Sequence, residues 1–237
     1  GSSYNHNVAS NKVNDMMDEM FHFVSNCEDE EVARGIAPLP GVLGTLNKLA
    51  SEYDVACGLV TGNVEGIARR KMQTLNIHST NAFTPLHEPQ GGRIWDGVED
   101  IRFLGGFGSD YCSASIDDAE RNYLDRGEQL AICVQRCVDL SSAKSSSMAG
   151  AKSTLGKVIH VGDAPADILA AKSYVDHPTK PKGVCVSVVG VATGSYSVEE
   201  LRELCGKSVP GVWEPVILEQ GRGVGDADVF LRACGLV

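Results

Sequence analysis

The sequence predicts an α/β fold built around a doubly wound, mostly parallel sheet. Two observations support this prediction. Short, β-branched apolar runs alternate with segments of helical periodicity, and several of the runs end in glycine or small polar residues. The chain has 237 residues, of which 43% are hydrophobic and 22% charged, so it is long and apolar enough to bury a substantial core.

The first quarter of the chain is predicted to be helical. Residues 14–26 carry methionine, phenylalanine and valine at helical spacing, and we expect this face to serve for packing. An acidic patch at 28–31 can open a short helix, and the Pro-Leu-Pro-Gly segment at 38–41 interrupts the pattern. A second amphipathic helix is expected over 42–52, with these residues on its apolar face: Leu43, Leu46, Leu49 and Ala50.

The middle of the chain begins with a buried strand over 53–60, followed by a basic helix over 64–75. The apolar run at 103–109 contains several glycines and is followed by a polar loop. Another helix is expected over 128–140. Residues 141–153 are mostly Ser, Ala, Gly and Lys, which predicts a low-complexity surface insertion.

Predicted strands and helices alternate most regularly in the last third of the chain. A buried strand ends in Gly162-Asp163 and is followed by a helix to about Tyr174, and a second strand is expected over 184–191. Ser197 should cap a helix that ends near Leu204. A short edge strand and a closing helix are expected over these segments: 216–218 and 227–234.

Composition narrows the functional classes. A net charge of −10 disfavours a general nucleic-acid binder, and no apolar run is long enough for a membrane span or a signal peptide core. The eight cysteines include no Cys-x-x-Cys pair, and several lie inside apolar runs. Free buried thiols are therefore favoured over disulfides, and we expect a cytoplasmic protein.

Asp163 and Asp167 form the first candidate site. The carboxyl end of a parallel strand is where open α/β sheets bind ligands, and both carboxylates should point towards one spot there. Carboxylate oxygens suit Mg²⁺, which also favours waters and substrate phosphate. The same residues also fit a simple capping turn at the start of a helix.

A second candidate site follows the strand predicted at 53–60. Thr61, Gly62 and Asn63 precede a helix directly, so backbone N–H groups, the helix dipole and the Thr61 hydroxyl can bind an anion. A cap without a ligand is the alternative. A cation can come from Arg126, at the expected start of the next helix, where Lys157 and Lys152 are rival candidates.

Three motifs in this order resemble those of the haloacid dehalogenase superfamily. They are Leu-Val-Thr-Gly-Asn at 59–63, Gly-Gly-Phe-Gly-Ser-Asp at 105–110, and Val-Gly-Asp-Ala-Pro-Ala-Asp-Ile at 161–168. The loop that begins at Gly190 resembles the end of the family's last core strand. The pattern is most similar to its phosphatases with a helical cap, of the phosphoglycolate-phosphatase type.

The resemblance implies a Rossmann-like core over 38–237, with insertions near 85–100 and 141–156, and the remaining part of an α-helical cap over 1–37. It implies that Thr61, Gly62 and Asn63 bind the phosphoryl group and that Arg126 replaces the family's usual lysine. Asp163 would bind Mg²⁺ directly, and Asp167 directly or through water. Of these, the catalytic residues would be Thr61, Arg126 and Asp163.

One family motif is absent. No hydrophobic strand followed by Asp-x-Asp-x-Thr occurs in these 237 residues, although the first Asp is the family's nucleophile and the second its general acid/base. Asp226-Ala-Asp228 follows glycine-rich sequence, and Asp117-Asp118 lies in an expected loop. A truncated or incompletely recorded chain is favoured over a natural loss, because a core without its central strand would expose two unpaired edges.

The resulting expectation is a Mg²⁺-dependent phosphohydrolase that acts on a small phosphorylated metabolite through an aspartyl-phosphate in the complete protein, as a monomer or homodimer. A non-catalytic binding protein of this fold is one alternative, and a phosphomutase or dehalogenase another. A dinucleotide-binding oxidoreductase is disfavoured, because the glycine-rich segments lack the Gly-x-Gly-x-x-Gly spacing.

Overall fold

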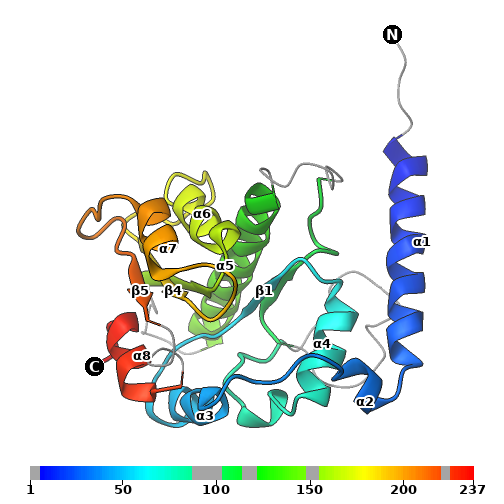
Figure 1. Ribbon diagram of the computed structural model, residues 1–237. Helices are drawn as coiled ribbons and strands as arrows, with labels where there is room; N and C mark the ends of the chain where they lie inside the picture. The colour runs from blue at the N-terminus through cyan, green and yellow to red at the C-terminus, as the bar shows by residue number, and fades with distance from the viewer. Residues whose placement is uncertain (1–5, 87–102, 114–121, 148–154, 220–224) are drawn as a thin grey trace.

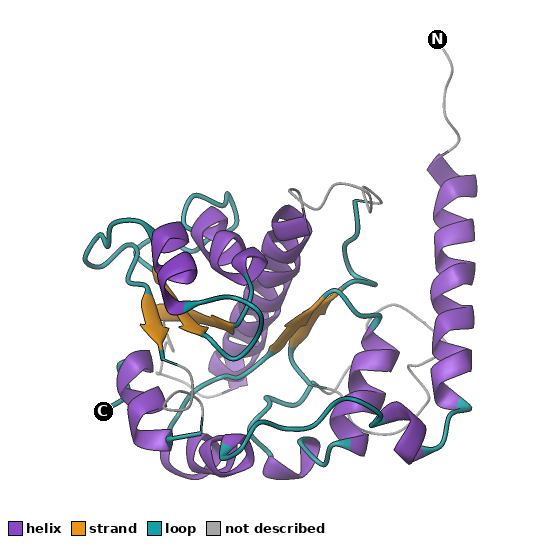
Figure 2. Cartoon of the chain, in the orientation of Figure 1, coloured by secondary structure: helices purple, strands orange, loops and turns teal. Residues whose placement is uncertain are grey.

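A computed structural model describes residues 6–86, 103–113, 122–147, 155–219 and 225–237. Within these ranges the protein is a mixed α/β structure with short parallel strands in two sheets (Figures 1 and 2). None of the helices in these ranges is both long and apolar enough to cross a membrane. The predicted α/β class is therefore confirmed.

The first sheet has two strands. β1 (Leu59–Thr61) pairs in parallel with β2 (Gly105–Phe107), and the register places Thr61 opposite Phe107. The strand expected over 53–60 is wrong in its bounds, because residues 53–58 have no strand partner and Val55 is 36% exposed. β2 was not expected, since glycine is a poor strand former. Gly106 is needed there because a side chain would collide with the backbone of Gln129.

The second sheet has three parallel strands in the order β3 (Lys157–Gly162), β4 (Cys185–Val191) and β5 (Val216–Leu218). All seven residues of β4 are buried, as expected for the central strand of a parallel sheet covered on both faces. The strands predicted at 158–162, 184–191 and 216–218 are confirmed, and β5 is an edge strand as expected.

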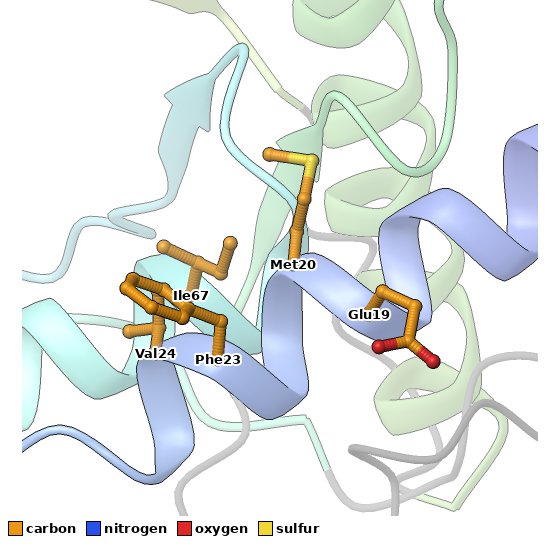
Figure 3. Close-up of a pocket in the computed structure, with 5 residues that line it drawn as sticks. All are labelled: Glu19, Met20, Phe23, Val24 and Ile67. Atoms are coloured by element: carbon orange, nitrogen blue, oxygen red, sulfur yellow. The ribbon is translucent and has the colours of Figure 1, made fainter.

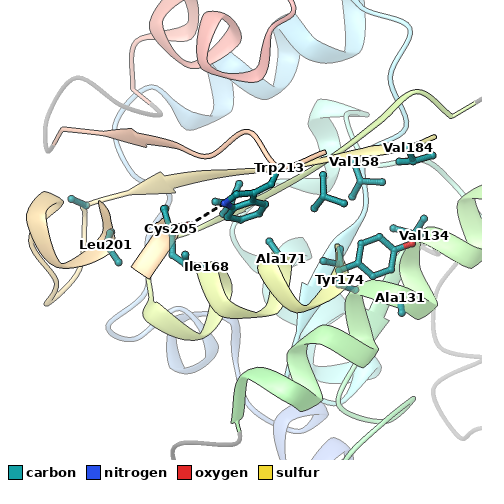
Figure 4. Close-up of a cluster of buried hydrophobic side chains, with 14 residues drawn as sticks. Ala131, Val134, Val158, Ile168, Ala171, Tyr174, Val184, Leu201, Cys205 and Trp213 are labelled. Atoms are coloured by element: carbon teal, nitrogen blue, oxygen red, sulfur yellow. Dashed lines mark hydrogen bonds between the residues drawn. The ribbon is translucent and has the colours of Figure 1, made fainter. Parts of the chain in front are cut away.

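The largest core cluster lies between this three-stranded sheet and α5 (Asn122–Ser147), α6 (Pro165–Tyr174) and α7 (Val198–Cys205) (Figure 4). Ile168 and Tyr174 on α6 are fully buried in it. The indole N–H of Trp213 donates to the carbonyl oxygen of Cys205 at 3.1 Å, which satisfies a polar group inside the apolar cluster.

Several predicted helices are confirmed with small changes. Ser197 caps α7 by accepting from the backbone N–H of Glu200, and Asp226 caps α8 (Ala227–Cys234), so the Asp-x-Asp at 226–228 is a helix start. α2 (Asp29–Val32) and α3 (Val42–Glu52) lie where expected. Ala50 is exposed, however, and Thr45 is buried in its place on the inner face of α3.

α5 departs most from expectation. It begins six residues earlier than predicted and continues to Ser147, so the first part of the Ser-rich segment is helical rather than a loop. Serine and alanine are tolerated in a helix, and their uniform composition hid the continuation. Asp117, Asp118 and Lys152, as well as most of the insertion expected near 85–100, lie outside the described residues.

α1 (His6–Ser25) stands at one side of the molecule and packs on α4 (Glu65–Thr74) (Figure 1). Its Met17 and Phe21 are buried against Val64 and Ile67. The packing expected of this helix is confirmed for that face only. Met16, Met20 and Phe23 are 47–73% exposed.

All eight cysteines are free, in agreement with the sequence-based expectation. Four are buried: Cys133, Cys185, Cys205 and Cys234. Burial raises the pKa of the Cys133 thiol to about 12 and that of Cys234 to about 11. These thiols are consequently protonated at neutral pH and act as small apolar side chains.

Candidate functional site

The carboxyl end of β3 positions the two predicted metal ligands. Gly162 ends the strand, and Asp163 follows as an exposed carboxylate. α6 then begins at Pro165, which places Asp167 in its first turn with only 6% exposure. Gly162 has no side chain, and the Asp167 carboxylate occupies the space that a Cβ would need. The sequence Gly-Asp-x-x-x-Asp therefore brings both acids to one strand end.

Arg126 reaches the same place from α5. Its Nη1 lies 3.0 Å from Oδ1 of Asp167, with 29% of the arginine side chain exposed. The predicted cation and one predicted metal ligand are thus in direct contact. Arg126 lies in the second turn of α5, because this helix begins at Asn122 rather than near Arg126. Its rival Lys157 starts β3 at the opposite edge and pairs with Glu214.

Asp167 has further partners. His160 on β3 is buried, and its Nε2 lies 3.4 Å from Asp167 Oδ1, while the Ala164 N–H donates to Oδ2 at 3.3 Å. Burial favours the neutral acid, but His160, Arg126 and the Ala164 N–H outweigh it, so the pKa of Asp167 lies below its ordinary value. Asp167 is therefore held as a carboxylate, and it also caps α6, as the simpler interpretation of the motif predicted.

The second candidate site forms at the end of β1. Thr61 Oγ1 accepts from the Asn63 backbone N–H at 3.2 Å and from Asn63 Nδ2 at 2.9 Å. Because the hydroxyl accepts both of these bonds, its own proton is left to donate to an anion. Gly62 is exposed and a Cβ there would meet nothing within 4 Å, so the turn is open. The turn at 61–63 is therefore accessible to an anion, whereas Arg126, the fourth predicted substrate-binding residue, pairs with Asp167.

Lys71 is a member of this group that the sequence did not single out. It lies two turns along α4 from Asn63, and its Nζ is 3.3 Å from Asn63 Oδ1. Side chains of a helix lean towards its N-terminus, which lets a long lysine reach the anion-binding end. The available signal was that Lys71 follows Asn63 by eight residues, which is about two helical turns. A lysine in a basic helix usually faces solvent, however, so this spacing alone did not single it out.

A buried ion pair lies on α4, directly after this turn. Glu65 and Arg69, one turn apart on α4, form an ion pair and are 3% and 7% exposed. Burial raises the pKa of Glu65 despite the neighbouring Arg69. The backbone N–H of Glu65 also donates to Ser109 Oγ at 3.2 Å, which ties the start of α4 to the loop after β2.

That loop is held in turn by α5. Arg136 binds both carboxylate oxygens of Asp110, at 2.7 and 2.8 Å, and donates to the Gly105 carbonyl at 2.7 Å. Such a bidentate pair fixes orientation as well as distance. Asp110 belongs to the motif at 105–110, and within the described residues its role is to shape the loop beside the Thr61 turn.

The two candidate sites lie at the carboxyl ends of strands from different sheets. α5 packs on β1, β2 and α6, and so links the two sheets. Among the described residues, however, no hydrogen bond or ion pair joins the Thr61 group to the Asp163 group. Within the residues that the structure describes, β1 pairs only with β2, and β3 pairs only with β4.

Asp163 and Asp167 are the candidate ligands of the implied Mg²⁺. Asp163 offers an exposed carboxylate, and its Oδ2 packs against Gly194, where a side chain would collide with it. Both oxygens of Asp167 are already hydrogen-bonded. The described residues include no cluster of three or more His, Cys, Asp or Glu that could hold a metal. The two aspartates fit a hard cation chemically, but they are only part of a complete ligand set.

Protein-family models and curated proteins, compared with this chain, give no match.

Proposed function

We propose that the complete protein is a Mg²⁺-dependent phosphohydrolase of the haloacid dehalogenase type. The observation that carries the proposal is the contact between Arg126 and Asp167, 3.0 Å, at the carboxyl end of β3. Sequence alone assigned these two residues to one site from positions 41 residues apart. A cation held against an acid, next to a second exposed acid, is suited to binding a phosphate ester together with a metal ion.

In this proposal the substrate phosphoryl group lies at the carboxyl edge of the strands. Thr61 donates its hydroxyl proton to one phosphoryl oxygen, and the N–H groups of the following turn assist. Arg126 neutralises negative charge next to Asp167. Asp163 would bind Mg²⁺ directly, and Asp167 through water, because both of its oxygens are engaged. When bound, Mg²⁺ would supply positive charge against the phosphoryl oxygens.

The nucleophile would be an aspartate of the first family motif, which these 237 residues do not contain. Its carboxylate oxygen would form a bond to phosphorus while the bond to the substrate oxygen breaks. The leaving alcohol would take its proton from the second acid of that motif, and water would then hydrolyse the acyl phosphate. The expected substrate is a small phosphorylated metabolite bound by a cytoplasmic monomer or homodimer.

The test is Mg²⁺-dependent phosphate release from p-nitrophenyl phosphate by the complete protein. Asp163→Asn should lower kcat/KM about 1,000-fold and Thr61→Val about 100-fold, because each removes stabilisation of the transferring group. Asp226→Asn is the matched control, since Asp226 only caps α8 and should leave turnover unchanged.

The alternatives give different results. No turnover by the complete protein would contradict the phosphatase proposal and favour a non-catalytic binding protein. Release of halide from a haloacid without Mg²⁺, in place of phosphate release, would favour a dehalogenase. Transfer of phosphate to a second substrate hydroxyl would favour a phosphomutase.

A further inference from the structure

An apolar pocket of about 350 Å³ opens between α1 and α4 (Figure 3). Figure 3 shows that four of its lining side chains are apolar and one is acidic: Glu19, Met20, Phe23, Val24 and Ile67. Met20 is 47% and Phe23 73% exposed, so the pocket has large apolar side chains at its mouth. Its volume lies within the usual range for small-molecule sites.

The pocket adjoins the Thr61 turn through one face of α4. Ile67 and Lys71 lie one turn apart on α4, about 6 Å from each other, and Asn63 lies just before the helix begins at Glu65. Ile67 lines the pocket, and Lys71 reaches past it to Asn63 Oδ1 at 3.3 Å. Asn63 in turn donates to Thr61. A polar anion-binding end and an apolar pocket therefore share one surface.

We propose that this pocket receives the organic group of a phosphate ester whose phosphoryl group binds at Thr61 and Asn63. The inference rests on the proposed function and narrows its substrate class. The organic group would be apolar and uncharged, such as an aryl or branched alkyl group, because the walls are apolar and the one charged lining residue, Glu19, repels a second anionic group. Lys71 would bind the phosphate side of the ester.

Met20 and Phe23 suit this role. Methionine is flexible and polarisable, so it adapts to organic groups of different shape, and Phe23 offers a ring face for stacking. Met16 lies one turn before Met20 on α1 and is 50% exposed, but it does not line the pocket. It therefore provides a matched control of similar exposure on the same helix.

The experiment is isothermal titration of the 237-residue chain with 1-naphthyl phosphate, inorganic phosphate and 1-naphthol. We expect 1-naphthyl phosphate to bind about tenfold or more tightly than phosphate, since the ring buries apolar surface in the pocket. Phe23→Ser should abolish this difference without changing the Kd of phosphate. Met16→Ser should leave both Kd values unchanged, and Thr61→Val should weaken phosphate and 1-naphthyl phosphate alike.

Each contrary result is informative. Equal affinity for phosphate and 1-naphthyl phosphate, or no effect of Phe23→Ser, overturns the pocket assignment; the proposed function then stands if phosphate binding still depends on Thr61. Equal affinity for 1-naphthol and 1-naphthyl phosphate shows apolar adhesion and also overturns it. Failure of the chain to bind either phosphate compound contradicts the pocket assignment and the phosphate site together.

Discussion

Each of the two sheets carries one of the two candidate sites, but different interactions hold the two sheets in place. In the three-stranded sheet, β4 has seven buried residues and lies in a large apolar cluster. In the two-stranded sheet, β1 has three residues, all only partly buried. β1 owes its position to its glycine-rich partner β2 and to the charged network of Glu65, Arg69, Asp110 and Arg136. A large apolar cluster thus stabilises one half. The other half has smaller apolar clusters around β1 and β2, and ion pairs and close backbone approach help to position it.

The largest expected effect comes from truncating the apolar core. Ile168 is fully buried among apolar neighbours, so Ile168→Ala should lower the free energy of unfolding by about 3–4 kcal/mol. Val60→Ala, at a partly buried position of β1, should cost only about 1 kcal/mol. Urea denaturation of the two variants measures both values. Equal losses would show that the two halves are packed alike.

A pair of glycines tests the close backbone approach in the two-stranded half. Gly106→Ala should lower the free energy of unfolding by about 2–3 kcal/mol, because its Cβ would collide with the Gln129 backbone. Gly62→Ala is the control, since nothing lies within 4 Å of its Cβ position, and its effect should stay below about 1 kcal/mol. A tolerated Gly106→Ala would contradict the packing of β2 against α5.

Thiol labelling compares the two halves without changing the sequence. Burial raises the pKa of Cys133, beside β1, to about 12 and that of Cys234, in the three-stranded half, to about 11, so both remain protonated at pH 8. Iodoacetamide should modify the exposed Cys112 first, and labelling of the other two should increase as the pH rises towards their pKa values.

The order in which the two buried thiols, Cys133 and Cys234, are labelled depends on how readily the structure around each one opens. Because the apolar clusters around β1 and β2 are smaller than the cluster around β4, we expect Cys133 to react before Cys234 when samples at one pH are followed over time by mass spectrometry. Labelling of Cys234 first would reverse the assignment of the more stable half.

The same difference explains what the sequence could predict. β3 and β4 are continuous β-branched runs, so the sequence pattern locates them, and the Gly-Asp ending of β3 indicated a candidate site there. β2 consists of glycine and phenylalanine, and its reason for being a strand is the close approach of Gln129, which no local pattern reveals. Arg126 was expected near the carboxyl edge because it lies at a helix start between the two strand ends, and it contacts Asp167 although α5 begins earlier, at Asn122. Lys71 and the Glu65–Arg69 pair were missed although their contacts are local to α4 and its start, because charged residues of a basic helix usually face solvent.

The central claim is that the two halves act on one phosphoryl group. It is tested most directly by a double-mutant cycle in the complete protein, with Thr61→Val, Asp163→Asn and the combined variant assayed for Mg²⁺-dependent kcat/KM. If both residues stabilise one transition state, the combined variant should lose little more than Asp163→Asn alone, a loss of about 1,000-fold. Losses that multiply to about 100,000-fold would show that Thr61 and Asp163 contribute without coupling, and unchanged activity in either single variant would contradict the account.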